Sequence, residues 1–565
     1  MNMNMDQKGN DPSHASGKDV RRLLFFWFLL LAVGARIAFW AMTDRIWEDS
    51  LITVRHAENA ARGLGLTHHP GHGQPVHGFT SPVSVLIPLL GELIVPGSGI
   101  DVVRVSSLLA AALTIWLGYR IAVHPAVDLS PIATAFFLGY LALEFHQILY
   151  GMAGMETQWI VAITLFGLWQ CLQRRSVGLG IACGLALWGR PDGIILILAI
   201  FVSLVWQRRW RALAIVFLVA ALTFAPWVLF TEIYYGSVVP HTVVAKKTGL
   251  LRLFQDQPTW AAWAECWAAE IARRANFLRL WFSPVYGGTG CVAVNFIRGA
   301  RPLQVVYFLL VCVGLWRTLR RDDARVIGVF GAGFAAYVLF VLPYPFYWYL
   351  MPWLGVVALL FALGIDRIRG EGRRPLRKYA AGALAVGYLA LYAFALTRTF
   401  PAERHIQIGI ENACRVPLGR WLDEHVAPND WVACECLGYF GWYSNRAILD
   451  FPGLCSPRSV AALRQVPEGE RSLAALVDRE RPEWLALRPS ELKHLRQKYP
   501  GAASLYVEAA RFQADPERVK KLGQCVWLDG FDLTIDEEFI VLRRRDVPIT
   551  TDAFTSFLEC YSRLR

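Results

Sequence analysis

The sequence RRLLFFWFLL, residues 21–30, decides the class of fold. Two arginines precede an unbroken apolar stretch, and apolar runs of roughly 17 to 22 residues, long enough to span a bilayer, recur as far as residue 397. Hydrophobic residues make up 55% of the 565 residues, more than the core of a water-soluble protein requires. The sequence therefore predicts an α-helical polytopic membrane protein.

We interpret the first apolar stretch as an uncleaved signal anchor. A cleaved signal peptide is the alternative, but Arg36 interrupts the stretch and no small-residue cleavage site is obvious. Residues 1–20 are polar, and we expect them to be a disordered cytoplasmic terminus. The net charge of +12 does not indicate nucleic-acid binding, because many Lys and Arg residues flank apolar segments and no basic face is interleaved with aromatic residues.

Basic clusters set the predicted topology. They occur near residues 174, 208, 320 and 370, whereas the connectors near 151 and 345 carry no basic residue. By the positive-inside rule the clusters are cytoplasmic and the uncharged connectors external, which gives about eleven crossings, external loops at 43–101 and 234–301, and an external C-terminus. After the first stretch, the predicted crossings are 102–122, 131–150, 156–173, two within 177–206 that form a hairpin with its outer tip at 189–193, then 212–233, 302–320, 326–343, 347–365 and 379–397.

Two regions are expected to lie outside the bilayer core. Because both ends of loop 43–101 are predicted to lie on the external side, the apolar stretch 83–95 within it is not counted as a crossing. It is predicted to be an interfacial or re-entrant helix, with a second surface helix at 48–62. Beyond residue 398 the long apolar runs stop, and short segments such as 431–434 and 447–451 read as strands. We therefore predict a transmembrane domain over 21–397 and an extracytoplasmic α/β domain over 398–565.

Cysteine and histidine residues leave two questions open. Eight of the eleven cysteines lie in segments predicted to be external, where disulfides can form, but no pairing can be deduced. The loop histidines at 68, 69, 72 and 77 are a candidate divalent-metal site. Loop histidines are more often solvated, so we predict no metal and no cofactor.

Short motifs run through the chain in a fixed order. Glu48-Asp49 opens a segment that continues to residue 59, and glycine-containing turns follow at 63–66 and 69–71. Further motifs are GMET at 154–157, RPDG at 190–193, YGSVVPHT at 235–242, GYFGWYS at 438–444 and DFPGL at 450–454. Together they resemble the GT-C superfamily of membrane glycosyltransferases that use lipid-linked sugars, and most of all the branch of the mycobacterial terminal arabinofuranosyltransferase.

The resemblance covers most of the chain and has three departures. Glu48 stands where the family's first Asp is usual, His69 stands in place of an Asn, and His77 stands in place of a Glu. The donor or acceptor pocket is therefore expected to differ from that of better-known relatives.

The chemistry of sugar transfer assigns a role to the acidic pair. Transfer from a polyprenyl phosphate needs a base for the acceptor hydroxyl, and a carboxylate at the outer membrane face meets that need. We predict Asp49 as the base, with Glu48 as an alternative base or as a partner that tunes Asp49 through like-charge coupling. The alternative is that one of the two acids only caps a helix that begins near Ser50.

Other residues are candidates for binding the substrates. The leaving phosphate needs cations, and Arg190, Lys246 and Arg55 are predicted to supply them, with snorkelling or an Arg190–Asp192 ion pair as the alternative. The residues predicted to bind sugar or acceptor are Glu156, His77, His241 and Tyr347. The alternatives are that Glu156 is only an acid at a helix N-terminus and that Tyr347 belongs to an aromatic belt at the membrane interface.

The resemblance implies an inverting glycosyltransferase in the bacterial inner membrane. Its donor would be a polyprenyl-phosphate sugar, with arabinofuranose as the implied sugar, and its acceptor a cell-envelope glycan or glycoconjugate on the outer side. A transporter or lipid flippase is the first rival, and it predicts charged residues in the middle of spans and paired repeats. A non-catalytic scaffold is the second rival, and it predicts loss of the acids.

Overall fold

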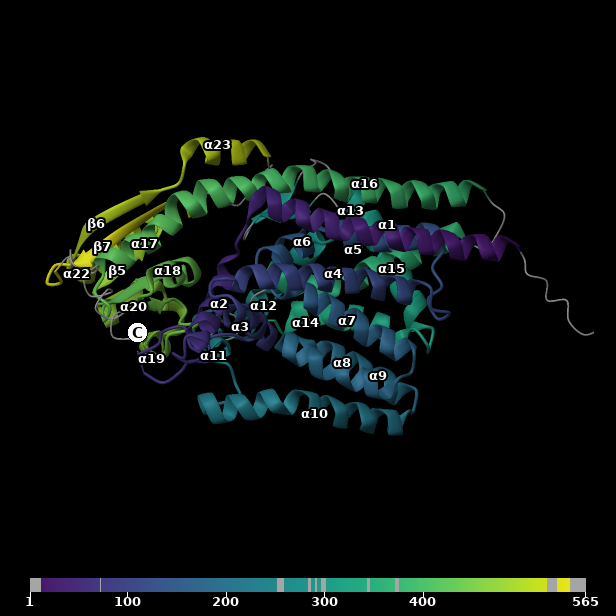
Figure 1. The fold of residues 1–565 in the computed structure, drawn as a ribbon, viewed down its shortest axis with the longest axis horizontal. Coiled ribbons are helices and arrows are strands. Elements are labelled where there is room, and N and C mark those ends of the chain that lie inside the picture. Colours follow the sequence, from purple (N-terminus) through teal and green to yellow (C-terminus); the bar gives the residue numbers. More distant parts are fainter. Residues whose placement is uncertain are drawn as a thin grey trace, which may run out of the picture.

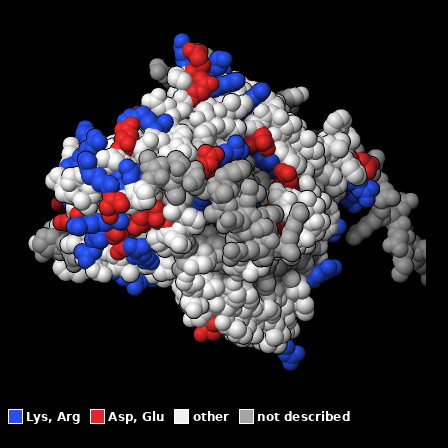
Figure 2. All heavy atoms as spheres, turned by 60° about the vertical axis from the view of Figure 1, so that its left-hand side comes forward, with Lys and Arg blue, Asp and Glu red and all other residues white. Residues whose placement is uncertain are grey.

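A bundle of long helices forms most of the molecule, and a smaller part that contains a β-sheet lies at one end of it (Figure 1). The computed structural model describes residues 12–71, 73–250, 259–282, 286–289, 292–295, 301–342, 346–370, 375–525 and 536–548. Charged side chains gather over the end that carries the sheet, while the flank of the bundle seen in Figure 2 is largely uncharged. This distribution fits a bundle that lies in a bilayer and a domain that lies in water.

The bundle contains helices that match the predicted crossings. Within the described residues, seven segments are long and apolar enough to span a membrane: Lys18–Thr43, Gly99–Ala122, Pro131–Met152, Trp210–Tyr235, Arg301–Leu319, Tyr347–Arg369 and Pro375–His425. Shorter apolar helices at Thr157–Leu172, Ser176–Gly189, Pro191–Trp206 and Arg325–Phe340 occupy the remaining predicted crossings. The predicted fold class, a polytopic helical bundle with an α/β domain, is confirmed.

The first helix begins earlier than expected. It starts at Pro12, inside the terminus that we predicted to be disordered as far as residue 20, and residues 1–11 lie outside the described residues. The bundle helices are α1 (Pro12–Thr43), α4 (Gly99–Ala122), α5 (Pro131–Leu143), α6 (Phe145–Met152), α7 (Thr157–Leu172), α8 (Ser176–Gly189), α9 (Ile194–Trp206), α10 (Trp210–Tyr235), α13 (Arg301–Leu319), α14 (Arg325–Phe340), α15 (Met351–Arg369) and α16 (Pro375–Ile406).

Two local sequence signals shape the bundle near the site. The predicted crossing 131–150 is split into α5 and α6, because Glu144 leaves the helical conformation and its side chain accepts the His146 and Gln147 N–H groups. The hairpin within 177–206 turns where predicted: Arg190 is extended, and Pro191 opens the short helix η1 (Pro191–Gly193) that leads into α9.

The segments between the spans form further elements. The two predicted surface helices are present as α2 (Glu48–Ala61) and α3 (Pro82–Ile94). Pro82 at the first position of α3 and the Ser81 side chain, which accepts the Ser84 N–H, fix where that helix begins. The later segment contains α11 (His241–Leu250), α12 (Trp260–Leu280), β1 (Tyr286–Thr289) and β2 (Val292–Asn295).

The C-terminal part, here called the sheet domain (Val416–Arg544), contains a five-stranded sheet with the order β4-β3-β5-β7-β6. The strands are β3 (Trp431–Cys434), β4 (Ala447–Asp450), β5 (Trp484–Leu487), β6 (Tyr506–Gln513) and β7 (Glu538–Arg544), so the strands predicted near 431 and 447 are confirmed. β3, β4 and β5 are parallel, and β7 is antiparallel to both its neighbours. Trp484 and Leu485 enter different apolar clusters, which shows that both faces of the sheet are covered.

Short helices cover the sheet and link it to the bundle. They are α17 (Val416–His425), α18 (Leu437–Ser444), α19 (Pro457–Arg464), η4 (Glu468–Glu470), α20 (Leu473–Glu480), α21 (Pro489–Lys498), α22 (Pro500–Ala503) and α23 (Pro516–Cys525). Helix α16 continues without a break through the π-helical segment η3 (Gln407–Arg415) into α17. One continuous helix thus joins bundle and sheet domain, and the boundary between residues 397 and 398 stays a prediction.

Candidate active site

Motifs that are far apart in the sequence meet around one polar cavity of about 80 Å³. The start of α2, the chain that leads into α3, the residues before α7, the α8–α9 turn, α11 and the short helix η2 (Tyr347–Leu350) all line it. The sheet domain adds Leu454, so the cavity lies where the bundle meets that domain. Its polar lining residues are Asp49, Ser50, Thr53, Thr80, Ser81, Ser84, Glu156, Arg190, Thr242, Lys246 and Tyr349.

Asp49 lies in the first turn of α2 and lines the cavity. Trp47 is the extended N-cap residue of this helix, and its ring packs edge-on against Tyr150 and Trp348, with ring centroids 5.1 and 5.6 Å away. No side chain forms a capping hydrogen bond at the N-cap of α2, but both acids lie in the first turn of that helix, as the alternative to a catalytic role expects. Among the described residues, no group forms a hydrogen bond or an ion pair with the half-buried Asp49 carboxylate.

Burial and a neighbouring ammonium group set the protonation of Asp49. Burial raises the pKa of Asp49 above its ordinary value, and the Lys246 ammonium opposes that rise. Burial lowers the pKa of Lys246, but Tyr349 and the Asp49 carboxylate outweigh it and bring the pKa above its ordinary value. The cavity therefore holds a carboxylate with increased proton affinity beside a stable cation, which suits a general base.

Tyr349 links the two cations of the cavity. Lys246 Nζ donates a hydrogen bond to the Tyr349 hydroxyl (2.8 Å), and the Arg190 guanidinium carbon lies 4.2 Å from the centre of the Tyr349 ring. Arg190 also pairs with Asp192 (Nε to Oδ1, 3.1 Å) and donates to the Trp348 carbonyl (3.0 Å). The ion pair offered as the alternative for Arg190 is thus present, yet Arg190 lines the cavity as well.

Glu156 is a second carboxylate on the cavity wall. It is buried and occupies the N-cap position of α7, but its side chain forms no capping hydrogen bond. Gly154, two residues earlier, has a φ of +95°, a conformation that favours glycine, and a Cβ there would touch the Ser50 side chain. The glycine of the GMET motif therefore lets the chain before α7 approach the start of α2.

An open apolar groove of about 530 Å³ adjoins the polar cavity. Helix α3 contributes to both, because Ser84 lines the cavity while Leu86 and Leu89 line the groove. Phe79 of the cavity wall also packs against Trp227 of the groove, with ring centroids 6.0 Å apart. The other groove residues come from the end of α2 and the turn after it, from α8 and from α10: Ala60, Gly63, Gly65, Leu66, Trp188, Pro226, Phe230 and Tyr234.

Comparison of sequences finds two matches. A family profile described as a domain of unknown function (DUF8728) matches residues 402–529, from the end of α16 into α23. The undecaprenyl phosphate-alpha-4-amino-4-deoxy-L-arabinose arabinosyl transferase of Pseudomonas paraeruginosa is 24% identical over 404 residues, which are 61% of this chain and 70% of that protein.

Comparison of structures finds membrane enzymes that share the architecture. ArnT from Cupriavidus metallidurans bound to undecaprenyl phosphate superposes with a TM-score of 0.53 and 12% identity, over 92% of this chain and 98% of that chain. The archaeal oligosaccharyltransferase AglB from Archaeoglobus fulgidus, in complex with an inhibitory peptide and a dolichol-phosphate, gives a TM-score of 0.52 and 12% identity, over 87% and 73%. This chain has the GT-C glycosyltransferase fold.

Within this GT-C fold the two adjacent acids point to different places. Glu48 does not line the cavity: its carboxylate pairs with Arg415 and accepts the Gly438 N–H (3.2 Å). The charges that shift the pKa of Asp49 are those of Lys246, Glu435 and Arg190 rather than that of Glu48. The geometry therefore supports neither the second base nor the like-charge partner that we predicted at Glu48.

Arg55, the third predicted phosphate ligand, lies away from the cavity. Its guanidinium pairs with Glu58 across one turn of α2 (3.7 Å), and the Trp442 indole donates to the same Glu58 carboxylate (2.8 Å). Arg55 therefore belongs to the contact between α2 and α18 rather than to the cavity lining.

Three further predicted residues also miss the cavity lining. The His77 ring stacks on Tyr235 with centroids 4.7 Å apart, and its carbonyl accepts the His241 N–H (3.0 Å). Tyr347 lies beside the His146 ring, with centroids 6.3 Å apart. In each case the next residue in the chain lines the cavity instead, namely Gly78, Thr242 and Trp348.

Tyr349 and Leu454 line the cavity, although the sequence did not predict them as site residues. Both lie in motifs that were singled out from the sequence, because Tyr349 ends the aromatic cluster near residue 345 and Leu454 ends the DFPGL motif. The aromatic cluster was assigned to the membrane interface, and its composition gives no sign of which ring turns inward.

The open questions about metals and disulfides have partial answers. Within the described residues, no group of three or more His, Cys, Asp or Glu side chains is placed to hold a metal ion. His68 and His69 contact each other through their Nδ1 atoms (3.2 Å), and His72 lies outside the described residues. The cysteines that the structure describes are unpaired thiols: Cys171, Cys183, Cys266, Cys312, Cys414, Cys434, Cys436 and Cys455.

Proposed function

We propose that this protein is an inverting glycosyltransferase that moves a sugar from a polyprenyl phosphate to a glycan or glycoconjugate of the cell envelope, at the outer face of the bacterial inner membrane. The cavity carries the proposal, because it holds a carboxylate near two cations and adjoins an apolar groove. The reaction needs a base, an anion site and a place for a lipid chain. The GT-C fold and the named activities of its relatives support the same class of reaction.

In the proposed reaction Asp49 is the general base. It accepts the proton of the acceptor hydroxyl while the oxygen attacks the anomeric carbon of the donor sugar. The bond from that carbon to the phosphate oxygen breaks, and its electron pair leaves with the polyprenyl phosphate. One displacement with one base inverts the configuration of the anomeric carbon. The raised pKa of Asp49 supports this role, because a base is most effective when its pKa approaches the working pH.

Arg190 and Lys246 are proposed to bind the donor phosphate. Negative charge grows on this phosphate as the sugar leaves, and charge-assisted hydrogen bonds become stronger as it grows. Tyr349 holds both cations in place, and Lys246 Nζ has three donors of which the Tyr349 hydroxyl uses one. Glu156, on the same wall, is proposed to bind hydroxyl groups of the sugar.

The apolar groove is proposed to hold the first isoprene units of the donor. Its lining is almost entirely apolar and aromatic, as a prenyl chain requires, and α3 lines both the groove and the polar cavity. The ArnT structure that shares this fold was solved with undecaprenyl phosphate, which supports a donor of the same chemical class.

A pentose carried on decaprenyl or undecaprenyl phosphate is the donor that we propose. The motif resemblance points to arabinofuranose, and the Pseudomonas relative is named for an amino-arabinose. The departures at Glu48 and His77 lie beside the cavity rather than in it, so the lining residues keep the character that a lipid-linked sugar requires. The sheet domain reaches the cavity through Leu454, and we propose that it helps to bind the acceptor.

Release of polyprenyl phosphate tests the proposal. The purified protein in nanodiscs is incubated with labelled polyprenyl-phosphate sugars, arabinofuranose and hexoses among them, together with a cell-envelope extract as acceptor. We expect acceptor-dependent release of polyprenyl phosphate by the wild type and none above background by Asp49→Asn. Release that is equal in the two proteins, or transport of an intact lipid donor without cleavage, would contradict the proposal.

A further inference from the structure

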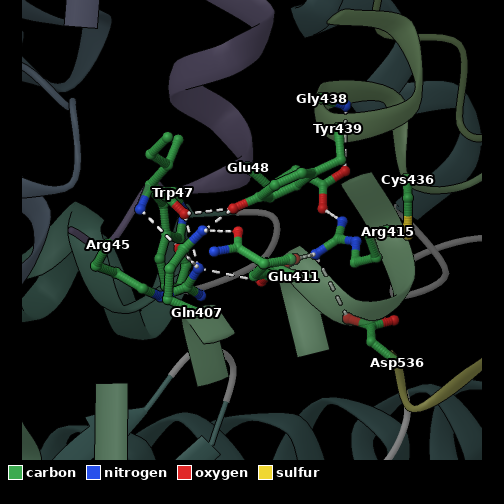
Figure 3. A network of polar contacts seen from close by, with 12 residues as sticks. Arg45, Trp47, Glu48, Gln407, Glu411, Arg415, Cys436, Gly438, Tyr439 and Asp536 are labelled. Atoms are coloured by element: carbon green, nitrogen blue, oxygen red, sulfur yellow. Dashed lines mark hydrogen bonds and ion pairs between the residues drawn. The ribbon is translucent and has the colours of Figure 1, made fainter. Parts of the chain in front are cut away.

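The segment that precedes Asp49 is bound on one side to the sheet domain and its connecting helix. The Ile46 N–H donates to Gln407 Oε1 (3.0 Å), and the Ile46 carbonyl accepts the Tyr439 hydroxyl (3.0 Å). Arg45 pairs with Glu411 (3.1 Å) in the same group of residues, which Figure 3 shows gathered around Glu48. Two adjacent residues of this segment therefore have their polar groups fixed by partners more than three hundred positions away in the sequence.

Arg415 is the centre of this network. Its guanidinium pairs with Glu48, with Glu411 (3.0 Å) and with Asp536 (3.8 Å), and it lies over the Tyr439 ring (Figure 3). Only 4% of the Arg415 side chain is exposed, so these contacts replace water almost completely. A buried cation of this kind holds its carboxylate partners in one geometry.

A close approach of two backbones adds a steric constraint. Gly438, the second residue of α18, lies directly against the start of α2, and its N–H donates to Glu48 Oε1 (3.2 Å). A Cβ at Gly438 would collide with the Glu48 carbonyl oxygen. Only glycine therefore allows α18 to lie this close to the residue before Asp49.

The opposite side of the same segment is bound to the bundle. The Trp47 N–H donates to the Ala153 carbonyl (2.9 Å), and the Trp47 ring packs on Tyr150 and Trp348. Successive residues thus alternate: Ile46 and Glu48 are fixed by the sheet domain and η3, whereas Trp47 and Asp49 face the bundle and the cavity. The position of the Asp49 carboxylate is set by both.

We propose that Glu48 and Arg415 are positioning residues, which fix the first turn of α2 so that Asp49 points into the cavity. The inference rests on the function proposed above, because it needs Asp49 to be the base. It gives the sheet domain a part in catalysis that is independent of acceptor binding. Neither residue touches the reacting atoms, so their effect reaches the reaction only through the orientation of Asp49.

The test uses Arg415→Gln, Glu48→Ala, Glu48→Gln and Gly438→Ala in the full-length protein, with Asp49→Asn as the reference. The matched control is Gly469→Ala, at a glycine of the same domain whose Cβ would meet open space. Turnover of the donor is measured as kcat and KM across a range of pH, and folding is checked by the melting temperature in detergent.

We expect Arg415→Gln, Glu48→Ala and Gly438→Ala to lower kcat by about tenfold to a hundredfold while the donor KM stays within about twofold, because a small misplacement of a catalytic group is costly. Glu48→Gln keeps an oxygen that can accept hydrogen bonds from Arg415 and Gly438, so it should retain most of the turnover. The fall of its kcat at acidic pH should match that of the wild type. Gly469→Ala should behave like the wild type. Because a smaller folded fraction would also lower the apparent kcat at an unchanged KM, kcat is expressed per folded molecule, as counted from the melting transition of each variant.

Two results would overturn the inference. Wild-type kcat in both folded Gly438→Ala and folded Glu48→Ala would show that the contact does not position Asp49. If Arg415→Gln does not fold, those two variants still decide. An inactive Glu48→Gln that matches Asp49→Asn would make Glu48 itself the base. Failure of the proposed function is distinct, because then the wild type would release no polyprenyl phosphate, or Asp49→Asn would release as much.

Discussion

Two regions that meet at the start of α2 differ in whether their charged side chains are paired. In the junction network around Arg415, three carboxylates, those of Glu48, Glu411 and Asp536, pair with one guanidinium. In the cavity one residue further on, the Asp49 carboxylate forms no hydrogen bond or ion pair with any described residue. Paired charges hold a structure in one geometry. A charge that is shielded from water without a partner costs free energy, and proteins retain such charges mainly at functional sites. The contrast supports the proposed roles, structural for Glu48 and catalytic for Asp49.

The largest effect should come from Asp49→Asn. Removal of a general base costs about a hundredfold to ten-thousandfold in rate, and the asparagine keeps the shape of the side chain. Donor turnover by the purified enzyme measures this loss. A loss of less than tenfold would place the base elsewhere, and Glu156 would be the next residue to test.

The second effect separates the cations of the cavity from ordinary surface charges. Lys246→Gln should lower kcat/KM for the donor by about a hundredfold, because it removes a half-buried cation that we propose binds the leaving phosphate. Lys247→Gln, on the exposed neighbour in the same helix, is the control and should change little. Equal effects of the two substitutions would argue for general electrostatic attraction rather than a phosphate site.

The third effect concerns stability at the junction. Arg415→Met removes the cation that pairs with Glu48 and one of the two arginines that pair with the buried Glu411 carboxylate, and breaking a buried pair costs about 3 kcal/mol in free energy of unfolding. The exposed pair of Arg511 with Glu508 is the comparison, and Arg511→Met should leave the melting temperature nearly unchanged. A similar melting temperature for both variants would show that the junction network is not structural.

The fourth effect tests the groove. Leu86→Glu places a charge in the apolar lining and should raise the KM for a long-chain donor by about tenfold, with a much smaller change for a short-chain analogue. Leu90→Glu, one turn further along α3 and outside the groove lining, is the matched control. If chain length makes no difference to the effect of Leu86→Glu, the prenyl chain does not lie there.

The smallest effects follow from the pKa of Asp49. Because burial raises this pKa, kcat should fall as the pH falls through the Asp49 pKa, which lies above that of an ordinary aspartate. This decrease of kcat at acidic pH should be absent from the residual activity of Asp49→Asn. A carboxyl whose folded pKa is raised stabilises the fold while protonated and loses that contribution as the pH rises through the folded pKa. Asp49→Asn should therefore raise the melting temperature slightly at neutral pH. A lower melting temperature would contradict the claim that the ionised Asp49 carboxylate destabilises the fold.

Much of the fold could be predicted because it depends on regular signals. Apolar length and the distribution of basic residues located the spans, and the turn at Arg190-Pro191 followed from the parity of the crossings. The continuation of α16 to His425 could not be predicted, because the helix becomes polar after Arg398 and its stability depends on tertiary contacts with residues such as Arg45.

The site was predictable to the level of the segment but not always of the residue. Asp49, Glu156, Arg190 and Lys246 line the cavity as expected, while His77, His241 and Tyr347 each stand one position before a lining residue. Adjacent residues in a helix or a turn point in different directions, and the motifs give no information on which direction faces the cavity. Arg415 and Gly438 act on a segment that is remote in sequence, so no local pattern could have paired them with Glu48.

A structure of the protein with bound polyprenyl phosphate tests the central claim most directly. We predict that the phosphate binds between Arg190 and Lys246 with Asp49 facing it, and that the prenyl chain lies along Leu86, Leu89 and Trp227. A phosphate bound at Arg55 instead, or a prenyl chain on another face of the bundle with the cavity untouched, would contradict the account.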